Sequence, residues 1–189
     1  MSGQTFTVAE YQKLIAAGIL TKDDKIELIE GLLVQREPRD PPHDGTVGIV
    51  ADVLNAVLPD GWNYRCLSSL ELPDSQPEPD FAVVRGSGDR RTYMTHHPTP
   101  ADTALVIEVA NATLAFDQRD KARIYARASV VCYWIINLED RRIEVHTQPS
   151  GPGDSPAYAS VQNYAPGDAV PLVLDGATVA TIPVADLLP

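Results

Sequence analysis

The sequence predicts an α/β fold of the α+β kind, in which a mixed β-sheet is flanked by helices. From about residue 44 to residue 137 the hydrophobic pattern reads helix, strand, strand, strand, helix, strand, which favours this layered arrangement. A length of 189 residues is typical of a single domain, so we expect residues 1–189 to form one unit with its core at about 44–137. Hydrophobic residues make up 44% of the chain, as in ordinary globular proteins.

The N-terminal segment predicts a helix followed by a hairpin. Thr7 and Glu10 fit a capping box, and apolar residues follow at helical spacing, which predicts a helix over about 8–17. Two apolar runs surround Glu30-Gly31 in the pattern of a β-hairpin, at 26–29 and 32–34. Three prolines between residues 37 and 42 predict a loop.

The central segment carries the clearest periodic signals. Asp44 is a suitable N-cap for a helix that ends before Pro59, and Asp117 is a suitable N-cap for a second helix over about 117–128. Residues 143–145 alternate as an exposed or edge strand does. The other strands expected here are 62–70, 80–84, 103–110 and 132–136.

The C-terminal segment predicts a β extension of the core. Residues 149–156 are rich in Pro, Gly and Ser, which predicts a flexible loop. Short strands are expected after it, at 157–164, 170–174 and 177–181.

Composition limits the classes of partner. The formal net charge of −11 argues against tight binding of DNA through many phosphate contacts, so any contact with nucleic acid must be local, weak or supplied by a partner. No apolar run approaches the length of a membrane span, and no signal peptide precedes the first helix. Cys66 and Cys132 lie in apolar strand-like runs without ligand spacing, which favours reduced thiols in a cytoplasmic protein.

Acidic residues inside apolar strands are the candidates for chemistry. Glu108 lies in a run that predicts a central strand buried on both faces, Asp80 opens another run after a proline, and Glu27 lies in a third. A lone buried carboxylate costs free energy unless a cation, a donor or a metal compensates it. Oxygen ligands of this kind suit Mg²⁺. Lys121 lies in the helix that follows Glu108, where its side chain can reach back over the sheet.

Three of these residues also have purely structural explanations. Asp80 can cap a turn after the proline, and Glu27 can be an ordinary acid of an edge strand. Lys121 follows Asp117 by four residues, so an exposed ion pair on one helix face accounts for it equally well. Glu108 is the hardest to explain in this way, because its neighbours on both sides are apolar.

Several segments occur in the order of a known family. They are 6–11, 26–31, 77–86, 97–102, 106–110, 117–121, 125–128 and 133–135. With Pro79-Asp80, Glu108 and a following lysine, the sequence resembles the PD-(D/E)XK nucleases, the restriction-endonuclease-like superfamily. Within it, the sequence is most similar to the Uma-type family of putative restriction endonucleases, over about residues 5–148.

This resemblance implies an αβββαβ nuclease core and a set of site residues. Asp80 and Glu108 would be ligands of Mg²⁺ or Mn²⁺, with the backbone carbonyl of Val109 as a further oxygen ligand. Lys121 would be the catalytic lysine, and Glu27 matches the upstream acid of the family. A cation held there would activate a water and stabilise the charge that develops on the phosphate.

The sequence departs from the pattern at several positions. Ala110 occupies the usual place of the superfamily lysine, so Lys121 would replace it from the helix. Asn111 stands where members often carry Asp. Ser129 and Val131-Cys132 replace the usual Gly and Pro-Glu.

The function implied is Mg²⁺-dependent endonuclease activity on DNA by a homodimer in the cytoplasm. Asp80, Glu108 and Lys121 favour an enzyme, whereas the net charge of −11 favours an inactive dimeric binding or regulatory module on the same fold. An enzyme that acts on RNA or another phosphoester is a third possibility. The arginines that we expect to form a local basic rim are Arg85, Arg90, Arg91, Arg119, Arg123 and Arg127.

Overall fold

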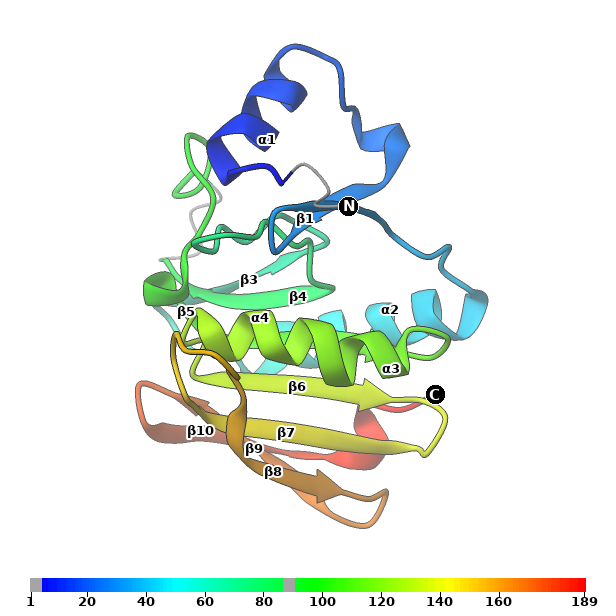
Figure 1. The fold of residues 1–189 in the computed structure, drawn as a ribbon. Coiled ribbons are helices and arrows are strands. Elements are labelled where there is room, and N and C mark those ends of the chain that lie inside the picture. Colours follow the sequence, from blue (N-terminus) through cyan, green and yellow to red (C-terminus); the bar gives the residue numbers. More distant parts are fainter. Residues whose placement is uncertain (1–4, 87–90) are drawn as a thin grey trace.

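The computed structural model of the chain, shown in Figure 1, describes residues 5–86 and 91–189. Its N-terminal layer contains α1 (Val8–Ala16), a 3-10 helix (Lys22–Asp24), β1 (Ile26–Ile29) and β2 (Leu32–Gln35). Thr7 and Glu10 form the predicted capping box. Glu30 and Gly31 both have positive φ angles, as a tight hairpin turn requires. The predicted helix and hairpin are therefore confirmed.

The centre of the molecule is a six-stranded sheet in the order β3-β4-β5-β6-β7-β8. Its strands are β3 (Trp62–Cys66), β4 (Phe81–Arg85), β5 (Thr103–Ala110), β6 (Cys132–Asn137), β7 (Arg142–Pro149) and β8 (Tyr158–Tyr164). β5 and β6 run parallel, whereas the other neighbouring strands run antiparallel. The sheet is therefore mixed, as the sequence predicts.

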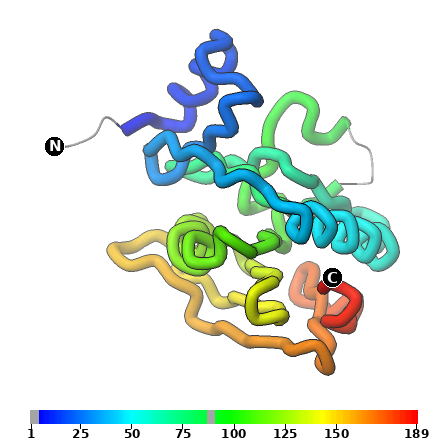
Figure 2. The backbone as a smooth tube through the Cα atoms, turned by 90° about the vertical axis from the view of Figure 1, so that its right-hand side faces the viewer, coloured from blue at the N-terminus to red at the C-terminus, as the bar shows by residue number. Residues whose placement is uncertain are grey.

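Helices cover both faces of this sheet, and the N-terminal layer lies beyond its β3–β4 end (Figures 1 and 2). One face carries α2 (Pro41–Val57) and the hairpin of β9 (Ala169–Leu174) and β10 (Ala177–Pro183). The other carries α3 (Leu114–Phe116), a π-helical turn (Asp117–Lys121) and α4 (Ala122–Arg127).

The alternation of β5 assigns its side chains to these two layers. Ile107 and Val109 pack in the core under α2, whereas Val106 and Ala110 pack in the core under α4. Glu108 has the same parity as Val106 and Ala110, so it points towards the α3–α4 side. Every residue of β5 is buried, as predicted for a central strand.

The helix α2 begins earlier than its apolar pattern indicates. Its N-cap is Asp40, whose side chain accepts a hydrogen bond from the N–H of His43, so the prediction of Asp44 as the cap is wrong. Pro41 and Pro42 fit the first turn because N–H groups there have no partner within the helix. The predicted proline loop therefore ends at Asp40.

The helical segment after β5 also begins earlier than predicted. It starts at Leu114, and Asp117 is not its N-cap but a buried residue of the π-helical turn. The carboxylate of Asp117 accepts a hydrogen bond from the hydroxyl of Thr113 at 2.6 Å. The extra residue of a π turn changes which side chains face the sheet, and such turns are frequent at functional sites.

The strand β7 is not the exposed or edge strand that its alternation predicts. It lies between β6 and β8, and residues 143–146 are buried. The β9–β10 hairpin and the α4 layer cover its two faces, which the short alternating pattern does not reveal. β3 ends at Cys66, before the predicted end at residue 70, while the C-terminal strands are confirmed.

Cys66 and Cys132 are free thiols, as expected for reduced cysteines. Within residues 5–86 and 91–189, no helix is both long enough and apolar enough to span a membrane.

Candidate active site

Glu108, Glu27 and Lys121 meet at the carboxyl end of β5. Lys121 donates a hydrogen bond from Nζ to Oε1 of Glu108 at 2.8 Å, and Oε2 of Glu27 lies 3.6 Å from the same ammonium. Tyr125, one turn further along the helix, donates its hydroxyl to the same Oε1 at 2.8 Å. Glu27 also accepts a hydrogen bond from the N–H of Glu78 at 2.9 Å. Strand β1, strand β5 and the helical segment therefore share one polar centre.

Asp80 joins this centre from the start of β4. Its Oδ2 accepts a hydrogen bond from the N–H of Val109 at 2.8 Å and lies 3.2 Å from Nε2 of His43. The N–H of Asp80 points at Oε2 of Glu108, at 3.4 Å. The antiparallel pairing of β4 and β5 places these two residues together, because Phe81 pairs with Ile107.

The centre holds more negative than positive charge. Glu27, Glu108 and Asp117 act on the ammonium of Lys121, Asp80 lies beside Glu108, and all five residues are at most 6% exposed. Burial, together with the charge of Asp80, raises the pKa of Glu108 to about 8, although Lys121 opposes the rise. Burial likewise raises the pKa of Asp117 to about 6. For Lys121, burial is outweighed by Glu108, Glu27 and Asp117, which raise its pKa and keep it protonated.

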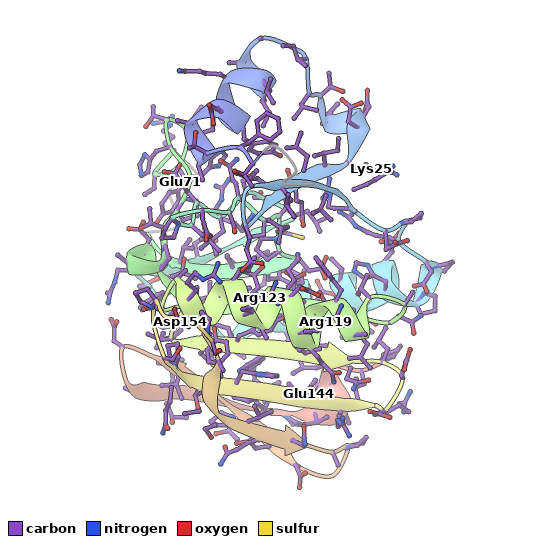
Figure 3. The ribbon with its side chains drawn as sticks, viewed as in Figure 1. Lys25, Glu71, Arg119, Arg123, Glu144 and Asp154 are labelled. Carbon is purple, nitrogen blue, oxygen red and sulfur yellow. The ribbon has the colours of Figure 1, made fainter. Side chains whose placement is uncertain are left out.

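The centre forms the floor of a cleft of about 420 Å³. One wall is the β2–α2 connection, residues 35–40, and the other is the segment from Asn111 to Arg119. Arg36, Arg39 and Arg119 line it among the acids. Figure 3 shows Arg119 and Arg123 on the helical segment that crosses the front of the sheet.

Comparisons with known proteins identify the family of the chain and a solved structure of similar fold. The model of the Uma2 family, described as "Putative restriction endonuclease", matches residues 8–184. The chain belongs to this family. A crystal structure described as a putative nuclease from Anabaena variabilis ATCC 29413 superposes with a TM-score of 0.70 at 18% sequence identity, over 96% of this chain and 97% of that one. At this identity the likeness shows a shared fold. A comparison with curated proteins finds no match.

The Uma2 fold brings together all four side chains that the sequence singles out. Lys121 is 5% exposed and bound to Glu108, so the alternative of an exposed pair with Asp117 is wrong. Glu27 is 2% exposed, so it is not an ordinary acid of an edge strand. The backbone N–H of Val109 is bound to Asp80, while the role of its carbonyl as a metal ligand stays a prediction.

The structure adds residues that the sequence pattern does not reveal. His43 and Asp117 line the cleft of this Uma2 protein, and the hydroxyl of Tyr125 is bound to Glu108. The first turn of a helix capped by Asp40 is the signal that places His43 near β4. Burial lowers the pKa of His43, but the hydrogen bond and charge of Asp80 outweigh burial and raise it.

Asn111 explains one departure from the family pattern. Its side-chain amide donates a hydrogen bond to Oδ2 of Asp40 at 2.6 Å, at the N-cap of α2. An aspartate at position 111 would place a second negative charge against Asp40. The hydrogen bond from the Asn111 amide therefore connects the end of β5 to the start of α2, across the cleft.

The predicted basic rim is only partly present. Arg119 lines the cleft, but Arg123 and Arg127 are bound to Glu30, which ties the hairpin to α4. Arg85 lies at the opposite end of the sheet, over the ring of Trp62. Arg91 does not line the cleft, and Arg90 lies outside the described residues. Arg36 and Arg39, on the β2–α2 connection, take their place.

The residues present fit a hard divalent cation. Where the chain is described, no group of three or more Asp, Glu, His or Cys side chains is arranged so that it could hold a metal ion. Mg²⁺ does not require one, since it is usually held by one or two carboxylates and keeps several waters. The excess of negative charge around Glu108 and Asp80 is the feature that such a cation would neutralise.

Proposed function

We propose that the protein is a Mg²⁺-dependent endonuclease that hydrolyses phosphodiester bonds of DNA. The observation that supports this most is the buried group of Glu27, Asp80, Glu108 and Lys121 on the floor of an open cleft. A structural ion pair needs one carboxylate for one ammonium, and this group has an excess of carboxylates. The family match to restriction endonucleases supports the same reading.

In this proposal each residue has a distinct role. Asp80 and Glu108 hold the cation, with the carbonyl of Val109 as a further oxygen. The bound ion would lower the pKa of a water and neutralise charge on the reacting phosphate. Lys121 keeps a fixed positive charge beside Glu108, where negative charge develops on the phosphate in the transition state. Glu27 holds the ammonium from its other side.

Cleavage of labelled DNA in Mg²⁺ or Mn²⁺, with and without EDTA, tests the proposal. We expect EDTA to abolish cleavage and Asp80→Asn to reduce it roughly 10³-fold, because metal activation and charge stabilisation fail together. Asp175→Asn is the matched control, since Asp175 is bound to Arg85 at the far end of the sheet. Bis(p-nitrophenyl) phosphate provides a second substrate that needs no recognition of nucleic acid. If the wild type cleaves neither substrate while calorimetry still shows Mn²⁺ binding, the protein is a binding module.

A further inference from the structure

The four side chains proposed for catalysis are buried in the protein rather than exposed on its surface. Glu27, Asp80, Glu108 and Lys121 are between 2% and 6% exposed, although all four line the cleft. A phosphate that reacts there must enter between the walls of the cleft, because a phosphate that lies across its mouth stays out of reach.

The size of the cleft limits what can enter. Its volume of about 420 Å³ lies in the lower part of the range for sites that enclose a small ligand. A space of this size encloses a ligand of about the size of a drug molecule rather than a wide polymer. Duplex DNA is much wider, since its major groove alone is about 12 Å across.

The walls of the cleft also offer apolar surface. Phe116 lines the cleft from α3, and Val34 and Pro38 line it from the β2 side. Phe116 and Val34 also pack against the core under α4, which holds both side chains in place. Bases of a single strand stack on aromatic rings of this kind with little regard to sequence, whereas paired bases are not available for stacking.

The positive charge around the cleft suits a few phosphates. Arg36 is bound to Glu78 at 2.7 Å, which leaves Arg39 and Arg119 as the more exposed cations of the walls. The side chain of Arg119 is 75% exposed and donates a hydrogen bond from Nε to the neighbouring carboxylate of Asp120. A protein with a net charge of −11 is poorly suited to binding the many consecutive phosphates of a duplex.

We propose that the cleft binds a single nucleic-acid strand, with one base stacked on Phe116 and its flanking phosphates held by Arg39 and Arg119. This inference rests on the proposed function and names its substrate class: a single-stranded segment or an unpaired end, not continuous duplex.

Fluorescence anisotropy with Ca²⁺ in place of Mg²⁺ measures binding apart from catalysis. We expect a labelled 12-nucleotide single strand to bind at least about tenfold more tightly than the duplex of the same sequence, and to be cut faster in Mg²⁺. Equal or tighter binding of the duplex would overturn the inference and leave the proposed function intact. Failure to cleave either the single strand or bis(p-nitrophenyl) phosphate in Mg²⁺ would overturn the proposed function and leave the binding result standing.

Variants locate the strand on the walls. Phe116→Leu keeps apolar packing but removes the ring, and we expect about tenfold weaker binding of the single strand, with Phe116→Tyr restoring it. Arg119→Ala should weaken binding and reduce its salt dependence. The exposed Lys22, outside the cleft, provides the control Lys22→Ala, which should bind as the wild type does. Wild-type binding by both Phe116→Leu and Arg119→Ala would refute the placement.

Discussion

Two buried glutamates lie in the same row of the central sheet and behave in opposite ways. Glu108 of β5 pairs with Ile135 of β6, and Ile135 pairs in turn with Glu144 of β7, so both carboxylates stand on the same face. They are 5% and 4% exposed. The π-helical turn reaches both, since Lys121 binds Glu108 and Gln118 binds Glu144.

The difference lies in their neighbours. Although burial opposes it, the imidazole of His146, 3.8 Å away, and hydrogen bonds from Asn137, Gln118 and Arg142 lower the pKa of Glu144 to about 2. Burial and three further carboxylates nearby raise the pKa of Glu108 to about 8, although Lys121 opposes the rise and both Lys121 and Tyr125 donate hydrogen bonds to it. The donors around Glu144 compensate its charge, and through Gln118 it holds β7 to the helical segment. Around Glu108, the carboxylates outnumber the single ammonium of Lys121. A buried carboxylate therefore indicates a reactive site only where its compensation is incomplete.

The largest expected effect separates the two glutamates by activity. Glu108→Gln should lower metal-dependent cleavage roughly 10³-fold or more, while the protein stays folded with equal or higher stability above neutral pH, because a buried carboxylate whose charged form is disfavoured is gone. Glu144→Gln should retain cleavage but lose about 2 kcal/mol of stability, since charge-assisted hydrogen bonds are lost. Single-turnover cleavage and urea unfolding of both variants measure this. The comparison fails if Glu144→Gln is the less active of the two.

The second prediction concerns the single ammonium of Lys121. Lys121→Met leaves four carboxylates without it, and we expect a loss of about 3 kcal/mol or more together with most of the activity. Millimolar Mg²⁺ should recover part of that stability, because a cation replaces the missing charge. Thermal unfolding with Mg²⁺ or EDTA measures this, with Lys13→Met on the exposed surface of α1 as control. Equal midpoints with and without Mg²⁺ in Lys121→Met would contradict a shared cation site.

The sequence predicts Glu108 more readily than Glu144 for a physical reason. Glu108 has three or more apolar residues on its N-terminal side and apolar residues after it, so burial follows from its own strand. Glu144 lies in a short alternating run, and its burial depends on β8 and on Gln118 of the π-helical turn, which are distant in the sequence. The hydrophobic pattern around Glu144 therefore cannot predict that these distant segments bury its side chain.

The same limit applies to the rest of the site. The family resemblance, and not the spacing of Lys121, predicts that this residue belongs to the site. By spacing alone, a helix lysine four residues after an aspartate is explained equally well by an exposed ion pair. His43 contacts Asp80 across 37 residues of chain, and only the true start of α2 at Pro41 brings it there. The order of helices and strands, in contrast, follows from local periodicity and is predicted nearly throughout.

The third prediction is a difference in pH dependence. The folded pKa of Glu108, about 8, lies above its ordinary 4.5, so the folded state binds more protons and stability falls as pH rises between these values. Asp117 adds a similar fall between 3.8 and about 6. Glu144, lowered from 4.5 to about 2, contributes stability above pH 4.5 that is lost as pH falls towards 2. Thermal midpoints in EDTA should therefore flatten above about pH 6 in Glu108→Gln, where Asp117 no longer titrates, and below pH 4.5 in Glu144→Gln. A Glu108→Gln profile parallel to the wild type would exclude the raised pKa.

The smallest expected effect tests whether the two regions act independently. Gln118 donates hydrogen bonds to both oxygens of Glu144 at 3.0 Å, and it lies in the same π-helical turn as Lys121. Gln118→Ala should cost about 1 kcal/mol of stability, since Glu144 keeps its bonds to Asn137 and Arg142.

The π-helical turn should keep its place in Gln118→Ala, because Thr113 still binds Asp117 and Lys121 still binds Glu108. We therefore expect no more than a few-fold change in cleavage rate. Double-mutant cycles in urea unfolding measure the coupling: Gln118→Ala should couple to Glu144→Gln and be additive with Glu108→Gln, which removes no shared partner. Strong coupling to Glu108→Gln would instead show that the compensated glutamate sets the geometry of the uncompensated one through the π-helical turn, and that the row of the sheet works as one unit.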